Sequence, residues 1–365
     1  MMRSTATRRA PRHAFTLVEI LVAIGILVLL AAIATPVALN ALKSAQASAV
    51  KMEVNGLADA IEQYRSKYGD YPPDGSNWTI LERHCRKAFP QILQTELNLL
   101  RRDILSQPPY NYQNFNTPFP ASDLEDFRVM SPAEALVFFL GGFSSNPQRP
   151  FTGPGGPFVL APGTTAVFQY NPARENAFYE FNSGQLSLTT TPYNGNPITI
   201  SNDESRFQCS DSANNLPDRP DLLPVYLDKY QRAPIVYFDS RTYLIPDPNG
   251  TGIAGNYYIN RISSQQFGTA VPYLSDELNT TVAPSQFYFQ NKQSFQIVSA
   301  GLDGIYSDAM GIFSSKSTPA IGIGDLQRYQ LNLSSKSTSN TYDNTSNFSD
   351  MARLGDVARK ATVSD

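Results

Sequence analysis

Residues 14–36 read AFTLVEILVAIGILVLLAAIATP, and this stretch decides how the chain is organised. No charged side chain occurs in the 23 residues from Ile20 to Leu42. A helix that rises 1.5 Å per residue crosses a hydrocarbon core of about 30 Å with about 20 residues. The sequence therefore predicts a single membrane-inserted helix, with its transmembrane part in residues 15–36.

The segment before this helix is basic. Residues 1–14 carry four arginines and no acid: Arg3, Arg8, Arg9 and Arg12. Basic flanks stay on the cytoplasmic side of a membrane, so the bulk of the chain is expected on the far side. An ordinary secretory signal is the alternative, because residues 31–34 could serve as a small-residue cleavage site. Glu19 inside the apolar run, and the amphipathic stretch that follows, argue against it.

The six residues from Ala14 to Glu19 resemble the class III signal of type IV pilins and type II secretion pseudopilins. The resemblance implies that a prepilin peptidase cleaves between Ala14 and Phe15, removes residues 1–14 as a leader, and methylates the new N-terminus of Phe15. Glu19 then takes the family's acidic fifth position. Pro36 becomes residue 22 of the mature chain, where many members carry a helix-kinking proline. Ala14 departs from the family, which usually has glycine before the cut.

The chemistry of Glu19 agrees with this reading. A lone carboxylate inside a membrane needs a partner. The free amine of Phe15 on an adjacent subunit is a suitable one, and such pairing would set the register of a filament. Assembly would then bring an opposite charge next to this carboxylate within the membrane-spanning layer.

A second helical pattern continues directly from the apolar segment. Apolar residues recur at spacings of three and four, which predicts an amphipathic helix to about residue 70: Leu39, Leu42, Val50, Val54, Leu57, Ile61, Tyr64 and Tyr68. The run from Gly69 to Pro73 should end it. Residues 57–72 also resemble the helix end of the major pseudopilin, where a Tyr-x-x-x-x-Gly-x-Tyr-Pro pattern recurs. The sequence thus predicts one long helix over residues 15–70.

Residues 71–365 are expected to form an α+β globular head in the periplasm. Helical patterns occur at about 79–105 and at 131–140, where Ser131 and Glu134 suit a capping box. Short strands are predicted at 157–160, 165–170, 177–181, 198–201, 234–238, 242–245, 256–261 and 294–299. With the long helix this indicates a pilin-like fold on an antiparallel sheet, with large loop insertions. The resemblance leaves an insertion at about 75–230 unexplained, and the enlarged head is similar to planctomycete prepilin-like proteins.

Residues 299–304, SAGLDG, resemble the Ser-x-Gly-x-Asp-Gly loop that binds calcium in the major pseudopilin. Calcium takes six to eight oxygen ligands from a loop that wraps around it. Asp303, Asp308 and the more distant Asp343 are the candidate ligands. The alternative is a plain Asp-Gly turn after the strand at 294–299. No other cofactor is expected.

Two cysteines, Cys85 and Cys209, could pair in an oxidising periplasm or remain buried free thiols. His84 and Cys85 are adjacent on a predicted helix and do not share a face, so a metal or nucleophile role is not expected. The chain shows no nucleophile–base pair or phosphate-binding loop, and it is therefore expected not to be an enzyme.

The whole-chain composition excludes further classes. A net charge of −3 gives no basic footprint for nucleic acid, and 41% hydrophobic residues are too many for a disordered chain. The favoured function is a structural subunit of a type II secretion pseudopilus, with prepilin peptidase, an inner-membrane assembly platform, other pseudopilins and copies of itself as partners. The alternatives are a type IV pilus subunit or adhesin, and a membrane-tethered carbohydrate-binding module or enzyme.

Overall fold

The computed structural model describes residues 17–104, 130–160, 162–163, 168–187, 190–193, 196–199, 223–230, 233–246, 257–260, 262–264, 267–273, 289–306 and 345–347. The chain divides into two compact units, residues 1–46 and residues 47–365. Helix α1 runs through both units, and all the sheets lie in the second.

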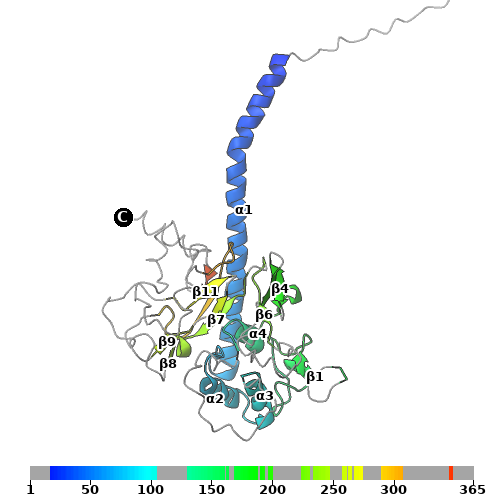
Figure 1. The fold of residues 1–365 in the computed structure, drawn as a ribbon, viewed down its shortest axis with the longest axis vertical. Coiled ribbons are helices and arrows are strands. Elements are labelled where there is room, and N and C mark those ends of the chain that lie inside the picture. The colour runs from blue at the N-terminus through cyan, green and yellow to red at the C-terminus, as the bar shows by residue number, and fades with distance from the viewer. Residues whose placement is uncertain are drawn as a thin grey trace, which may run out of the picture. The chain divides into compact units, whose positions relative to one another are not determined.

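The predicted long helix is confirmed as α1, Leu17–Tyr68, a continuous helix of 52 residues (Figure 1). It ends where the chain reaches Gly69, whose φ of 73° lies in the left-handed region. Glycine adopts this conformation without a Cβ clash, and it is the common residue just after a helix. The Gly69 amide still donates to the Arg65 carbonyl at 2.7 Å, which closes the last turn.

One stripe of the second half of α1 is buried. The side chains on it are 2% exposed or less: Ala47, Val50, Val54, Leu57, Ala60, Ile61 and Tyr64. Leu39 and Leu42, which the helical pattern places on the same stripe, are 54% and 55% exposed. The amphipathic pattern therefore predicts the buried face correctly only from Ala47 onward.

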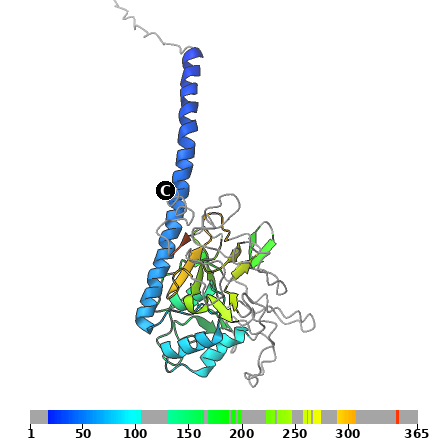
Figure 2. The ribbon, with the colours of Figure 1, turned by 90° about the vertical axis from the view of Figure 1, so that its left-hand side faces the viewer.

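Two short helices follow α1, where the sequence shows helical patterns over 79–105. They are α2, Trp78–Ala88, and α3, Gln94–Ile104. The Asn77 side chain caps α2 by accepting a hydrogen bond from the Ile80 amide at 3.2 Å. Both helices lie near the C-terminal end of α1 (Figures 1 and 2).

Helix α4, Glu134–Leu140, confirms the predicted capping box. The Ser131 amide donates to the Glu134 carboxylate at 2.7 Å, and the Glu134 amide donates to the Ser131 hydroxyl at 3.3 Å. At the other end of α4, the guanidinium of Arg174 donates to the carbonyls of Val137 and Phe138, each at 2.6 Å. The orphan carbonyls of this buried helix are thereby satisfied.

The central sheet has three antiparallel strands in the order β13–β12–β7. They are β7, Val236–Asp239, β12, Phe295–Ser299, and β13, Thr345–Ser346. Both β7 and β12 are buried along their whole length. In both ribbon views this sheet lies beside the second half of α1 (Figures 1 and 2).

The other strands form two-stranded antiparallel sheets. These pair β1, Phe158–Leu160, with β2, Phe168–Tyr170; β3, Leu186–Ser187, with β6, Val225–Tyr226; β4, Thr190–Tyr193, with β5, Asn196–Thr199; β8, Leu244–Pro246, with β9, Tyr257–Ile259; and β10, Ile262–Ser264, with β11, Gly268–Ala270. Small antiparallel sheets around one long helix make a mixed α+β fold that is consistent with a pilin-like architecture.

The strand predicted at 177–181 is wrong. In this segment the amides of Phe178 and Tyr179 both donate to the Leu140 carbonyl, at 2.8 and 3.2 Å, rather than to a neighbouring strand. The predicted strand at 242–245 is also displaced, because residues 240–242 form a 3₁₀ turn, η4, before β8 begins. Aromatic residues in both segments mimic a strand signal, but their rings pack against the core instead.

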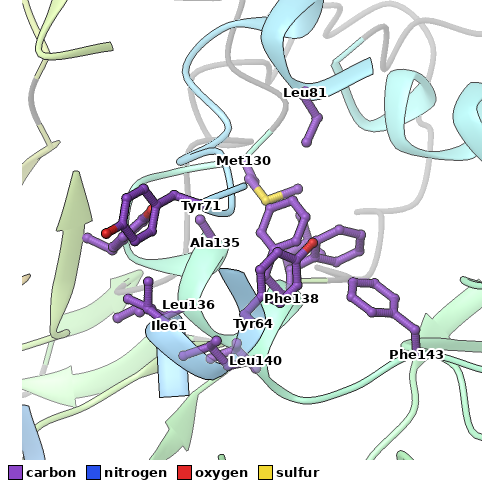
Figure 3. Packing of buried hydrophobic residues seen from close by; sticks show 14 of the residues in the cluster. Ile61, Tyr64, Tyr71, Leu81, Met130, Ala135, Leu136, Phe138, Leu140 and Phe143 are labelled. Carbon is purple, nitrogen blue, oxygen red and sulfur yellow. The ribbon is translucent and has the colours of Figure 1, made fainter. Parts of the chain in front are cut away.

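The main core brings α1 together with residues from the segment expected to be an insertion. Ile61 and Tyr64 of α1 point toward Leu136 and Leu140 of α4, with Met130 nearby (Figure 3). Aromatic rings fill the space between the helices, and the ring of Tyr64 lies edge-on to Phe139 with centroids 5.7 Å apart. The described residues of the 75–230 segment that belong to this cluster, Leu136 and Leu140 among them, are therefore part of the core that holds α1.

Truncation of a buried α1 side chain should destabilise the head. We expect Ile61→Ala to lower the free energy of unfolding by about 2–5 kcal/mol, since it removes buried methyl groups and leaves a cavity. Met52→Ala on the same helix is the matched control, because Met52 is 75% exposed and its loss should change stability by less than about 0.5 kcal/mol. Denaturant unfolding of the full chain in detergent micelles measures both. Equal losses would mean that the buried stripe does not hold the head.

Candidate functional site

The first half of α1 is the candidate site. Its large apolar side chains, from Leu17 to Leu42, are between 51% and 79% exposed. The helix is long and apolar enough to cross a membrane, and none of its most apolar window is buried inside the protein. A core helix of a soluble domain would be mostly buried. This segment therefore carries a surface that must be covered by lipid or by another chain.

Glu19 lies in the first turn of α1. A carboxylate is favourable there, because the free amides of a helix N-terminus carry partial positive charge. The predicted cleavage residues Ala14 and Phe15 lie outside the described residues, and the pairing of Glu19 with the Phe15 amine stays a prediction. The structure places Glu19 two residues after the start of α1, at the end of the helix nearest the expected cut.

Pro36 lies inside α1 and the helix continues through it. Proline has no amide hydrogen, so the Ala32 carbonyl cannot receive its usual bond from residue 36. One residue earlier, the Thr35 hydroxyl donates to the Ala31 carbonyl at 2.7 Å. A proline next to such a back-bonded threonine weakens the helical ladder locally. Pro36 is thus the point at which α1 bends or melts most easily.

The second half of α1 is fastened to the head by Glu53, which the sequence reading missed. Its carboxylate accepts hydrogen bonds from the Tyr226 hydroxyl and the Gln185 amide, both at 2.8 Å. It also accepts from the Lys229 backbone amide at 3.2 Å. The sequence signal for this role was the position of Glu53 beside the buried stripe, between Val50 and Leu57 and next to Val54.

The loop after β12 is a tight turn in the described residues. Gly301 and Gly304 have φ values of 73° and 75°, and the Asp303 carboxylate accepts a hydrogen bond from the Ile305 amide at 2.8 Å. This is an Asx-type turn. Among the described residues no group of three or more His, Cys, Asp or Glu side chains could hold a metal ion. Asp308 and Asp343 lie outside them, so calcium binding stays a prediction.

Cys85 is a free thiol, fully buried in α2. Burial raises the pKa of this thiol to about 12, which leaves it protonated and unreactive at neutral pH. Cys209 lies outside the described residues, so the pairing of the two cysteines is untested. Burial likewise lowers the pKa of His84 to about 4, and its Nε2 lies 2.7 Å from the Tyr64 hydroxyl. Both side chains serve as core residues.

Comparison with known proteins adds one match. Residues 9–35 match the family described as the prokaryotic N-terminal methylation motif. No protein of curated function and no solved structure matches the chain. The match spans the leader junction, Glu19 and most of the exposed apolar half of α1. The chain thus carries the N-terminal signal of pilin-like proteins, which implies processing by a prepilin peptidase and assembly with pilin-type subunits.

The Asp303 turn gives a direct test of the two readings of this loop. If the side chain serves only the turn, Asp303→Asn should keep the hydrogen bond to the Ile305 amide, and Asp303→Ala should lose at most about 0.5–1.5 kcal/mol. Calcium should then leave the melting temperature of all three proteins unchanged. A rise with calcium that only the wild type shows would identify Asp303 as a ligand.

Proposed function

We propose that this protein is a structural subunit of a type II secretion pseudopilus, anchored in the inner membrane by α1 with its head in the periplasm. The observation that carries the proposal is the methylation motif at residues 9–35, whose part from Leu17 onward lies in the exposed apolar half of α1. The subunit acts by assembly rather than by catalysis.

The exposed half of α1 has two suitable environments. In the bilayer, lipid chains cover its apolar side chains, and in a filament the same side chains pack against neighbouring helices. Because both environments are apolar, transfer between them involves little net change in hydrophobic burial. A small specific interaction can therefore decide where the subunit resides.

Glu19 is suited to supply that interaction. A carboxylate at membrane depth costs about 2.5–3.5 kcal/mol on insertion scales. In an assembled filament the methylated amine of Phe15 on a neighbouring subunit would neutralise it. The pair would favour the assembled state and fix the stagger between neighbours.

The finer assignment to a secretion pseudopilus is supported by the resemblance of residues 299–304 to the loop of the major pseudopilin. A type IV pilus subunit would share the same N-terminal half of α1. Deletion of the gene in its native host separates the two: loss of secreted enzymes with surface fibres intact supports the pseudopilus, and loss of fibres with normal secretion contradicts it.

Processing is the first testable step. We expect protein from cells with prepilin peptidase to begin at Phe15 with one added methyl group, because residues 14–19 resemble a signal that is cleaved before the phenylalanine. Cells that lack the peptidase should retain residues 1–14. Intact-mass measurement distinguishes the two forms, and Ala14→Gly, which restores the usual residue, should be cleaved at the same bond. Any other N-terminus would remove the basis of the proposal.

Assembly into filaments is the second testable step. Glu19→Ala should still insert into the membrane and be cleaved at Phe15, because the apolar helix and the junction are unchanged. It should form few or no filaments, since the register-setting charge is gone. Pull-down of filaments from cells that overexpress the system quantifies this, with Asp59→Ala as a control that removes an exposed acid elsewhere on α1. Wild-type filament yield from Glu19→Ala would disprove the role of Glu19.

A further inference from the structure

A buried polar cluster lies where the chain leaves α1. It joins residues 69–76, which connect α1 to α2, to the end of β7 and to η4. Two of its carboxyl groups are almost completely buried, since Asp74 is 0% and Asp239 is 1% exposed. The proposed assembly function uses neither of them.

Asp74 is surrounded by donors from three parts of the chain. Its Oδ1 accepts from the Ser76 amide at 3.1 Å. Its Oδ2 accepts from the Asp239 amide at 3.1 Å, the Asn260 side-chain amide at 2.8 Å and the Thr242 hydroxyl at 2.6 Å. None of these donors carries a positive charge, so within the described part of the chain Asp74 has hydrogen bonds but no ion pair.

Arg241, the cation of the cluster, forms ion pairs with Asp239 and Asp70 and not with Asp74. Its Nε lies 2.6 Å from the Asp239 carboxylate, and a terminal nitrogen lies 2.9 Å from the Asp70 carboxylate. Its other terminal nitrogen donates to the Tyr71 carbonyl at 2.7 Å. The guanidinium thereby ties the α1–α2 connection to η4.

The charges do not balance if every acid is ionised. Asp70 lies at the surface, where Lys87 at 3.9 Å shares it with Arg241. That leaves two buried carboxyls, Asp74 and Asp239, and one guanidinium. Among the described residues, the other groups that face the cluster are neutral at pH 7: the phenols of Tyr71, Tyr237 and Tyr243, whose pKa values burial raises, and His84, whose pKa burial lowers. On the far side of the Tyr71 phenol, Glu62 and Arg65 lie 3.6 Å apart as an ion pair, which adds no net charge. An unbalanced charge in such a site is costly.

The Thr242 hydroxyl allows a neutral carboxyl at Asp74. This hydroxyl lies 2.6 Å from Asp74 Oδ2 and 3.1 Å from the Asp239 carbonyl. It can donate to an ionised Asp74, or accept from a protonated Asp74 and donate to the carbonyl. Rotation of one O–H bond therefore accommodates both protonation states without moving a heavy atom.

We propose that Asp74 and Asp239 together hold one proton in the folded head, so that the attachment of the α1–α2 connection to β7 and η4 is pH-sensitive. The two carboxyls titrate as a unit. The proton is bound when the head folds and is released when it unfolds at neutral pH. Mildly acidic surroundings thus strengthen this attachment, and alkaline surroundings weaken it.

The direction of the pH effect follows from the acids themselves. Burial raises the pKa of both carboxyls, that of Asp239 to about 7, whereas an unfolded aspartate has a pKa of about 3.9. Between these values the folded state binds a proton that the unfolded state does not. The contribution of this pair to the folding equilibrium constant should therefore decrease about tenfold for each pH unit from about 5 to about 7, and level off above. His84, whose pKa is lowered to about 4, contributes the opposite dependence up to about pH 6.5, so the contribution of the pair is measured as the difference between the wild type and a variant.

The experiment compares pH profiles of unfolding for the full chain in detergent micelles. Trp78, the single tryptophan, reports on the head through its fluorescence. Asp74→Asn and Asp239→Asn each replace one carboxyl by a neutral side chain of the same size. We expect the pH dependence of at least one of them to differ from that of the wild type by about tenfold per pH unit, and that of Asp59→Asn, an exposed acid on α1, to match the wild type. Retention of the wild-type slope by both cluster variants would overturn the proposal.

A second measurement needs no variant to fold. In protein labelled with ¹³C at the aspartate side-chain carboxyl, the infrared spectrum at pH 6 should contain the band of one protonated carboxylic acid. The isotope separates this band from any glutamate, including Glu19. Its disappearance above about pH 8 supports the shared proton, and its absence at pH 6 overturns it.

Discussion

The structure depends on one constraint: a single helix has to satisfy two different surroundings. The first half of α1 presents apolar side chains on every face, whereas the second half presents them on one stripe that the head covers. Hydrophobic burial stabilises both halves, but the protein's own core supplies the partner for only the second. The core of the head covers the apolar stripe of residues 47–68, whereas the apolar side chains of the preceding half of α1 need lipid or neighbouring subunits to cover them.

The head binds the second half of α1 through apolar packing and a few hydrogen bonds. Tyr64 fills the core with its ring and its hydroxyl lies 2.7 Å from His84. Glu53 accepts hydrogen bonds from Gln185 in a 3₁₀ turn, Tyr226 in β6 and the Lys229 amide in the turn that follows. Packing favours many similar arrangements, while hydrogen bonds to a buried acid favour one. Such contacts fix the rotation of α1 about its own axis relative to the head, which any regular array of subunits requires.

Sequence reasoning succeeded where a local pattern alone determines the outcome. The unbroken apolar run, the buried stripe from Val50 to Tyr64, the turn at Gly69 and the capping box at Ser131 all follow from periodicity and cap chemistry. Sequence reasoning failed where contacts with residues distant in sequence determine the local structure. Residues 177–181 look like a strand, but the amides of Phe178 and Tyr179 donate to the Leu140 carbonyl at the end of α4 instead of to a neighbouring strand. Apart from Ser76, the partners of Glu53 and Asp74 lie 132 or more residues away in sequence, and no spacing rule brings them together.

The exposed half of α1 also restricts the route by which such a subunit can travel. Fifteen large apolar side chains lie open on it between Leu17 and Leu42. At about 1.5–3 kcal/mol for each side chain, exposing them all to water would cost on the order of tens of kcal/mol. No appreciable pool of free subunits can therefore exist in the aqueous phase. If the subunit assembles as proposed above, each copy has to pass directly between the bilayer and the filament, and the membrane is then the reservoir of subunits.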